Sequence, residues 1–297
     1  MKFLVTGGAG FIGSHIVDSL IDEGHRVVCI DDESAESNEN FWWNGEAENH
    51  RVSVNCYDCL PYLMKDVSAV FHLAAESRVQ TCTKDPRIAV KTNVLGMCNV
   101  LQAALENGVK RVIYSSTSSA YGLNNLVPNK EDMKVDCINP YASTKVAGEL
   151  LCKNYASLFG LETVIFRYFN VYGDRSPVRG QYAPLVGRFL KQYSDNEPLT
   201  IVPDGNQRRD YIHVSDVAEI NLISAFKENI SSGEIYNVGR GTNYSVKEIA
   251  DMISDKQVFI EPRDGEAEET LAYTSKTCDE FNWNPLVDLE SWILENK

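Results

Sequence analysis

The chain of 297 residues is 43% hydrophobic and 24% charged, which is the composition of a globular protein with a full core. Its formal net charge of −14 argues against nucleic acid as a partner, because such a surface repels phosphate backbones. An anionic ligand would need a locally positive site on this negatively charged protein, formed by helix N-termini and a few arginines.

Predicted strands and helices alternate through the first half of the chain. An apolar run at 2–8 that ends in glycines predicts a buried strand, and apolar spacing at 10–24 predicts a helix. The elements expected next, in chain order, are strands at 25–32, 51–56 and 67–75, a helix at 85–108, a strand that breaks into a polar turn over 109–122, a helix at 140–159 and a strand at 162–173.

This alternation predicts an α/β fold, with a Rossmann-type doubly wound parallel sheet covered by helices on both faces. After about residue 170 the pattern loosens into prolines, loops and shorter elements. We therefore expect one domain over 1–168, to which segments near 211–220 and 235–239 return. A smaller C-terminal domain is expected mainly over 169–297.

The N-terminus does not resemble a secretion signal, since its apolar run is short and a glycine-rich turn follows at once. No segment approaches the length of a membrane span, so we expect a cytoplasmic protein without membrane contact. Of the eight cysteines, Cys56 and Cys59 have C-x-x-C spacing, but no second pair or nearby histidine completes a zinc set. The sequence therefore predicts no metal and reduced thiols that mostly pack in the interior.

The stretch "TGGAGFIG" follows the first predicted strand and opens the first predicted helix. Glycines at positions 7, 10 and 13 permit a tight turn and close approach of a pyrophosphate, which the helix N-terminus attracts. A purely structural glycine turn is the alternative. The second strand ends in Asp31, which can accept hydrogen bonds from ribose hydroxyls and would repel a 2′-phosphate. The pattern therefore favours NAD over NADP.

Two further stretches carry groups suited to chemistry. The hydroxyl-rich "YSSTSSAYG" (114–122) follows a predicted strand, at the sheet edge where ligands of such folds bind. In "NPYASTK" (139–145), Tyr141 and Lys145 share one helix face at i and i+4. The alternatives are an ordinary polar turn and an amphipathic helix with a solvated lysine.

These stretches together resemble the extended short-chain dehydrogenase/reductase family, and above all its nucleotide-sugar epimerases of the UDP-glucose or UDP-N-acetylglucosamine 4-epimerase type. The likeness covers nearly the whole chain in the family order. It is carried by "TGGAGFIGSH", "VFHLAA", "TNVLG", "SSTSSAYG", "PYASTK", "RYFNVYG" and "RRDYIHVSDVA". It implies a Rossmann domain that binds NAD and a smaller domain that binds a nucleotide sugar.

The resemblance implies that Thr117, Tyr141 and Lys145 are catalytic. A phenol of pKa about 10 is a poor base at neutral pH. The Lys145 ammonium and the positive nicotinamide ring are therefore expected to lower the pKa of Tyr141. Lys145 would also hold the nicotinamide ribose.

The resemblance also implies two sets of binding residues. NAD would contact Gly7, Gly10, Phe11, Ile12, Gly13, Asp31, Asp32, Asn55, Cys56, Leu73, Ala74, Ala75, Asn93, Ser115, Tyr141, Lys145 and Tyr168. The substrate would contact Ser77, Thr117, Asn170, Gln181, Tyr182, Arg209, Arg263, Glu266 and Thr270. Asn55 and Cys56 depart from the family, which usually has an Asp-Ile pair that contacts adenine.

The function expected from the resemblance is NAD-dependent epimerisation at carbon-4 of a nucleotide sugar, through a 4-keto intermediate. The nucleotide is expected to be UDP, and the sugar glucose/galactose, their N-acetylated forms, or both. The alternatives are a UDP-glucuronate 4-epimerase or decarboxylase, a 4,6-dehydratase, a 4-keto-sugar reductase and a non-catalytic NAD-sensing module. Ser118 and Ser119 argue against the dehydratases, which carry an Asp-Glu pair there, and against the decarboxylases, which keep a glutamate.

Other features receive less specific interpretations. Family members commonly pair through a four-helix bundle, so a homodimer is expected through helices 85–107 and 140–159. Phe41, Trp42 and Trp43 lie in an acidic loop and could cover the cofactor or a partner, although packing within the loop is the simpler reading.

Overall fold

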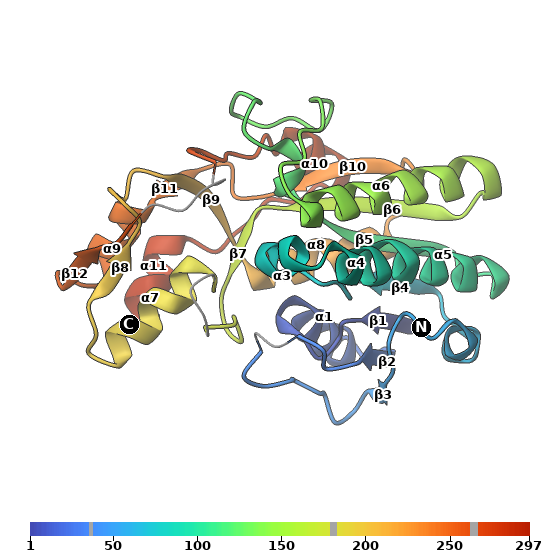
Figure 1. The fold of residues 1–297 in the computed structure, drawn as a ribbon. Helices are drawn as coiled ribbons and strands as arrows, with labels where there is room; N and C mark the ends of the chain where they lie inside the picture. The colour runs from blue at the N-terminus through green and yellow to red at the C-terminus, as the bar shows by residue number, and fades with distance from the viewer. Residues whose placement is uncertain (36–37, 179–182, 262–266) are drawn as a thin grey trace.

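A computed structural model describes residues 1–35, 38–178, 183–261 and 267–297. Its largest element is a seven-stranded parallel sheet in the order β10-β6-β5-β4-β1-β2-β3, which confirms the predicted fold class (Figure 1). The strands are β1 (Lys2–Thr6), β2 (Arg26–Asp31), β3 (Glu48–Arg51), β4 (Ala69–His72), β5 (Arg111–Thr117), β6 (Glu162–Tyr168) and β10 (Glu234–Val238).

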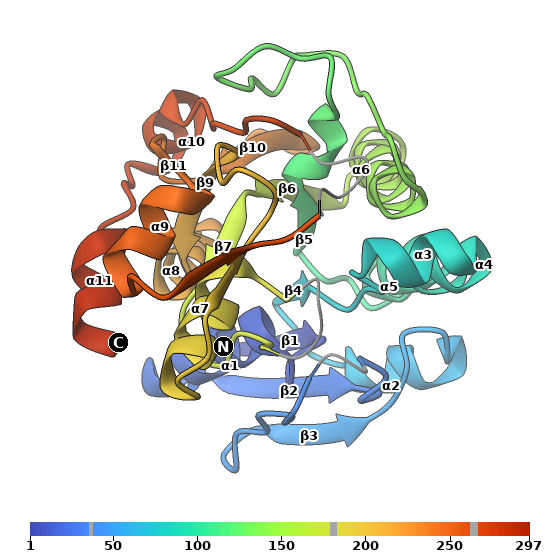
Figure 2. The ribbon, with the colours of Figure 1, turned by 60° about the vertical axis from the view of Figure 1, so that its left-hand side comes forward.

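Helices cover both faces of this sheet, as Figure 2 shows. One face carries α1 (Phe11–Asp22), α8 (Val214–Phe226) and α10 (Ser275–Phe281). The other carries α2 (Leu60–Leu63), α5 (Gly96–Glu106) and α6 (Pro140–Phe159). Before α5, the chain passes through α3 (Val79–Lys84), α4 (Pro86–Ala89) and the π-helical turn η2 (Val90–Leu95).

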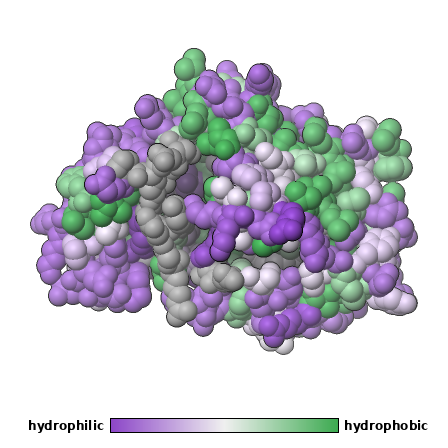
Figure 3. All heavy atoms as spheres, in the orientation of Figure 1, coloured by the Kyte–Doolittle hydropathy of each residue, from purple (hydrophilic) through white to green (hydrophobic). Residues whose placement is uncertain are grey.

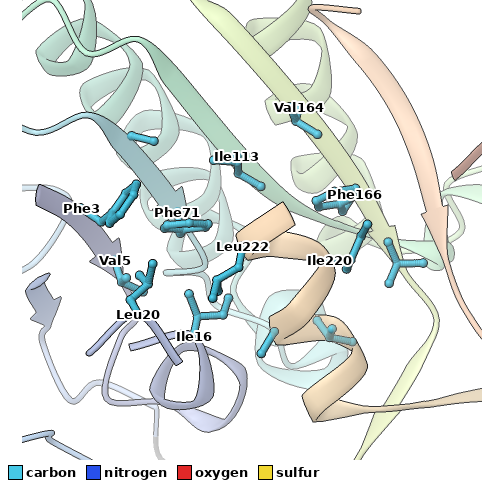
Figure 4. Close-up of a cluster of buried hydrophobic side chains, with 14 of the residues drawn as sticks. Phe3, Val5, Ile16, Leu20, Phe71, Ile113, Val164, Phe166, Ile220 and Leu222 are labelled. Atoms are coloured by element: carbon cyan, nitrogen blue, oxygen red, sulfur yellow. The ribbon is translucent and has the colours of Figure 1, made fainter. Parts of the chain in front are cut away.

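The alternation of side chains along the strands builds two cores. Phe3 and Val5 of β1 point toward α1 and α8, where they pack with Phe71 and Phe166 (Figure 4). Leu4, between them in the sequence, packs on the opposite face beneath α5. Burial on both faces explains why the strands read as continuous apolar runs.

The C-terminal part has a core of its own, built from Tyr172, Phe189, Ile201 and Ile249 with their neighbours. Its helices are α7 (Leu185–Ser194), α9 (Val246–Ile253) and α11 (Leu289–Asn296). Its strands are β7 (Asn170–Tyr172), β9 (Arg208–His213) and β11 (Asn243–Ser245) in one small sheet and β8 (Leu199–Ile201) with β12 (Gln257–Phe259) in another. The remaining short helical turns are η1 (Tyr57–Cys59) and η3 (Ser118–Tyr121). The division at residue 168 stays a prediction.

Three sequence expectations are corrected. The strand expected at 51–56 lies at Glu48–Arg51, because this polar edge strand is held by pairing with β2 and not by an apolar pattern. The helical run Pro86–Glu106 does reach the length and hydropathy of a membrane span, and 44% of its window is buried in the protein. A core helix meets the same criteria. Cys56 and Cys59 form a disulfide, so they are not reduced packing residues.

Candidate active site

One cavity of about 1290 Å³ runs along the carboxyl ends of the parallel strands, where ligands of such sheets bind. Its wall at one end is the glycine-rich turn between β1 and α1, and the end of β2. The ends of β5 and α6 form its middle, and β7, α7 and β9 form its far part.

The glycine-rich turn fits a pyrophosphate. Gly7 has a φ of +66°, which favours glycine, and a Cβ there would lie 2.8 Å from the Ala74 nitrogen. A Cβ at Gly13 would lie 2.1 Å from the Gly7 carbonyl oxygen. The turn can therefore close tightly against α1 and present the helix N-terminus to phosphate groups.

Asp31 ties the end of β2 to this turn. Its carboxylate accepts hydrogen bonds from the backbone nitrogens of Ala9, at 3.2 Å, and Glu33, at 2.9 Å. Burial raises the pKa of Asp31, and these backbone hydrogen bonds oppose the shift. The carboxylate lines the cavity, at a place where it can accept hydrogen bonds from ribose hydroxyls.

Asn55 presents a second feature that fits the adenosine end of a dinucleotide. Its side-chain oxygen is buried and receives no hydrogen bond from the described part of the chain. A buried acceptor without a donor is costly, and an amino group of adenine could satisfy it. Asn55 and Cys56 are not among the cavity-lining residues, whereas Val52 and Val54 of the same segment are.

Thr117 ends β5, and Tyr141 begins the long helix α6, so two neighbouring elements bring them to the middle of the cavity. Asn139 caps this helix by accepting a hydrogen bond from the Ala142 nitrogen at 2.9 Å. A hydrogen bond joins the side chains of Thr117 and Tyr141 and lowers the pKa of the phenol. Burial outweighs it and raises the pKa of Tyr141 to about 12.

Burial therefore shifts the pKa of Tyr141 opposite to the expected direction, and the Lys145 ammonium makes a contact of its own. The Nζ of Lys145 lies 4.4 Å from the centre of the Tyr114 ring, in a cation–π contact. Burial lowers the pKa of Lys145 to about 7, with Cys152 and Glu149 opposing. In this arrangement burial is the largest cause of the pKa shifts of both Tyr141 and Lys145.

Asn93 supports the site from below. Its side-chain nitrogen donates to Thr144 Oγ1 at 2.9 Å and to the Glu76 carbonyl at 3.0 Å. Its oxygen accepts from the Glu76 nitrogen at 2.8 Å. Asn93 does not line the cavity itself, but it joins α6, next to Lys145, to the segment that carries Ser77.

The far part of the cavity holds the described residues expected to contact a substrate. Asn170 follows β6, and its side chain donates to the Asp210 carbonyl at 3.0 Å. Arg209 precedes Asp210 in β9 of the small sheet. Thr270 receives a hydrogen bond from the Asp210 nitrogen at 3.5 Å. The candidates Gln181, Tyr182, Arg263 and Glu266 lie outside the described residues.

The cavity brings most of the other candidates together. Those that line it are Gly7, Gly10, Phe11, Ile12, Gly13, Asp31, Asp32, Leu73, Ala74, Ala75, Ser77, Ser115, Thr117, Tyr141, Lys145, Tyr168, Asn170, Arg209 and Thr270. Arg78, Arg188 and Asn38 also line the cavity, and the sequence analysis did not identify them. Phe41 lines the cavity as well, although packing within its loop was the simpler interpretation of the sequence. No motif marked Arg78, Arg188 or Asn38, because tertiary contacts place them.

This fold, with its glycine-rich turn and its hydroxyl, phenol and ammonium groups in one cavity, defines a dinucleotide-dependent enzyme of the short-chain dehydrogenase/reductase type. The model of the NAD dependent epimerase/dehydratase family matches residues 3–239, and the chain belongs to this family. The resemblance stated from the sequence is thereby confirmed, and so is NAD as the cofactor.

Three proteins illustrate the likeness. The UDP-glucose 4-epimerase of Thermotoga maritima, solved with UDP-glucose, shares 32% sequence identity with this chain, and the two structures superpose with a TM-score of 0.93. The match covers 100% of this chain and 97% of that one. The UDP-N-acetylglucosamine 4-epimerase of Methanobrevibacter ruminantium, solved with UDP-N-acetylmuramic acid, is 33% identical with a TM-score of 0.92 and coverage of 99% and 96%. A UDP-N-acetyl-alpha-D-glucosaminuronate decarboxylase of Bacillus cytotoxicus is 36% identical over 84% of this chain and 78% of its own.

Proposed function

We propose that the protein is an NAD-dependent epimerase that inverts carbon-4 of a UDP-linked sugar. The observation that carries the proposal is that one cavity joins a dinucleotide-binding turn to Thr117, Tyr141 and Lys145 and then to Arg209. When bound, NAD supplies a reversible hydride acceptor, which a redox-neutral epimerisation needs. The relatives at 32% and 33% identity support the same reaction.

Each residue has a defined role in the proposed reaction. Tyr141 accepts the proton of the sugar 4-hydroxyl as the carbon-4 hydride leaves, and Thr117 shares the hydrogen bond. Lys145 would hold the nicotinamide ribose, and its positive charge near the phenol would favour the phenolate. Arg209 would bind the diphosphate, about which the 4-keto sugar would turn, so that carbon-4 regains its hydrogen on the opposite face and the 4-oxygen regains the proton from Tyr141.

The carboxylates of the cavity support epimerisation over its alternatives. Among the described lining residues the only carboxylates are Asp31 and Asp32, both at the cofactor end. Ser118 and Ser119 follow Thr117 at the catalytic centre and carry no acidic group. Loss of water needs a base and an acid near the sugar, and the described residues of this part of the cavity offer no carboxyl group for that work.

Incubation with UDP-glucose, UDP-galactose, their N-acetylated forms and UDP-glucuronate tests the proposal. An epimerase converts one of them into a product of unchanged mass and inverted carbon-4 configuration, seen by mass spectrometry and proton NMR. A product that has lost carbon dioxide or water would reject epimerisation in favour of a lyase. Bound NAD without turnover of any of these sugars would favour the sensing module.

Thr270 is proposed as a gate beside the carbon-2 substituent of the sugar. In the family a tyrosine at this place goes with plain hexoses, and a small residue goes with tolerance of an N-acetyl group. Of the three residues 269–271, only Thr270 lines the cavity, and the Glu269 carboxylate instead accepts a hydrogen bond from Asn243 at 2.6 Å. The small threonine supports acceptance of N-acetylated sugars.

Replacement Thr270→Tyr is expected to lower kcat/KM for the N-acetylated sugars relative to the plain hexoses by about tenfold. The reason is that one substituent in a pocket is worth only about 1–3 kcal/mol of discrimination. Steady-state kinetics with both sugar types measure the ratio. An unchanged ratio in the variant, or a parent enzyme active on plain hexoses alone, would remove Thr270 as the gate.

A homodimer is proposed through the adjacent helices α4–α5 and α6. Ile88, Val90 and Leu95 on the first run are 44–50% exposed, and Leu150 on α6 is 58% exposed. Figure 3 shows apolar side chains gathered over this part of the surface. Apolar surface of this kind is typical of protein interfaces, and a second copy would cover it.

Replacement Leu150→Glu is therefore expected to convert the dimer into a monomer, because it would bury a charge in the interface. Sedimentation velocity measures the mass. Leu126→Glu is the control, since Leu126 is 83% exposed and lies outside these helices. A monomeric parent, or a Leu150→Glu variant that remains dimeric, would contradict this interface. Six of the eight cysteines are free, which supports the further proposal of a cytoplasmic protein.

A further inference from the structure

The acidic loop after β2 crosses the outer side of the glycine-rich turn. The backbone nitrogen of Trp42 donates to the carbonyl of Ala9 at 2.8 Å. Phe41 and Asn38 of the same loop line the cavity together with Gly10. The amide nitrogen of Asn38 would lie 3.9 Å from a Cβ on Gly10. This loop is therefore the outer wall of the part of the cavity that fits the pyrophosphate.

A second loop, which follows β7 at the start of the C-terminal part, meets the first one there. The guanidinium carbon of Arg175 lies 5.3 Å from the centre of the Trp42 ring. Arg175 also forms an ion pair of 2.7 Å with Asp18 of α1, and Pro177 of the same loop lines the cavity. In Figure 1 the connection after β2 runs past the end of α1 toward the segment that follows β7.

Contacts with α1 hold a described residue of the first loop and the beginning of the second. Asp18 accepts a second hydrogen bond, from Asn44 at 2.7 Å, so one carboxylate holds both loops to α1. His15, one turn earlier, has a ring nitrogen 3.0 Å from the Asp174 carbonyl. Arg175 has a φ of +64°, a conformation that non-glycine residues adopt at a cost and keep only where contacts enforce it.

We propose that Asp18, Trp42 and Arg175, here called the clasp, close the outer side of the cofactor site and retain NAD between turnovers. The proposal rests on the proposed function, because it takes the cavity beneath these loops as the place of the NAD pyrophosphate. Retention suits a reaction in which the hydride returns to the same sugar, because each cofactor molecule is regenerated where it was used. The clasp joins the two parts of the protein beside the glycine-rich turn, whose Ala9 carbonyl accepts from the Trp42 nitrogen.

Release of bound NADH tests the clasp. The holoprotein is loaded with NADH, mixed with a large excess of NAD+, and followed by the decay of NADH fluorescence. Trp42→Ala and Arg175→Ala are each expected to release NADH about tenfold faster than the parent, since either change removes the cation–π contact. The double variant should release NADH about as fast as Arg175→Ala, because both substitutions break the same cation–π contact and Arg175→Ala also removes the ion pair with Asp18.

Tyr62→Ala is the matched control, because Tyr62 is an aromatic residue of the same part, is 84% exposed and does not line the cavity. It should release NADH at the parent rate. Release from both clasp variants within twofold of this control would overturn the proposal and leave Trp42 with a packing role. If Trp42→Ala does not fold, Arg175→Ala decides alone. A parent that binds no NADH would instead reject the cofactor site itself, so the two failures are distinguishable.

Discussion

Replacement of Tyr141 by phenylalanine is expected to lower kcat by about a thousandfold while the fold and NAD binding persist. A positioned general base contributes about 10²–10⁴-fold in rate, and Tyr141 is the group proposed to accept the proton of the sugar 4-hydroxyl. Burial raises the pKa of the phenol to about 12. Formation of the phenolate therefore needs positive charges nearby, namely Lys145 and the nicotinamide ring of bound NAD. Removal of one oxygen leaves the volume of the side chain almost unchanged.

The measurement is kcat with saturating substrate, together with NADH binding by fluorescence. Tyr155→Phe is the matched control, since it removes a phenol on the same helix that donates to Gln102 at 2.9 Å, away from the cavity. Its kcat should match that of the parent. A Tyr141→Phe enzyme that keeps a tenth or more of the parent kcat would show that another group accepts the proton.

Replacement of Glu149 by glutamine is expected to lower the free energy of unfolding by about 3–5 kcal/mol. Glu149 lies on the helix face of Tyr141 and Lys145, and its carboxylate accepts from Arg167 at 2.8 and 2.7 Å and from Ser116 at 2.6 Å. The side chains of the ion pair are 2% and 3% exposed. Glutamine keeps the size of the side chain but leaves the arginine charge buried without its partner.

Urea unfolding followed by circular dichroism measures this loss. Replacing both partners by apolar residues, as Glu149→Leu with Arg167→Met, should recover much of the stability, because no unpaired charge then remains buried. The exposed pair Lys247–Asp251 supplies the control, and Lys247→Ala should leave the urea midpoint nearly unchanged. A Glu149→Gln midpoint equal to that of the parent would show that the pair does not hold α6 on the sheet.

The local pattern of the sequence was sufficient for the central features. Apolar runs predicted β1, β2, β4 and β5 within a few residues, because strands buried on both faces carry a continuous signal. The glycine spacing predicted a turn that the structure places beside Asp31. Thr117 and Tyr141, distant in the chain, could be paired only through the resemblance to known enzymes.

Tertiary structure alone decided the features that depend on segments distant in sequence. The position of β3 follows from pairing with β2, since its own residues are polar and exposed. The direction of the Tyr141 pKa shift follows from burial, which a helix face does not specify. The contact of Lys145 with the Tyr114 ring likewise depends on how α6 packs on the sheet. Trp42 and Arg175 carry no local signal for each other. A sequence period determines which face a side chain takes on its own element, whereas the fold determines what that face meets.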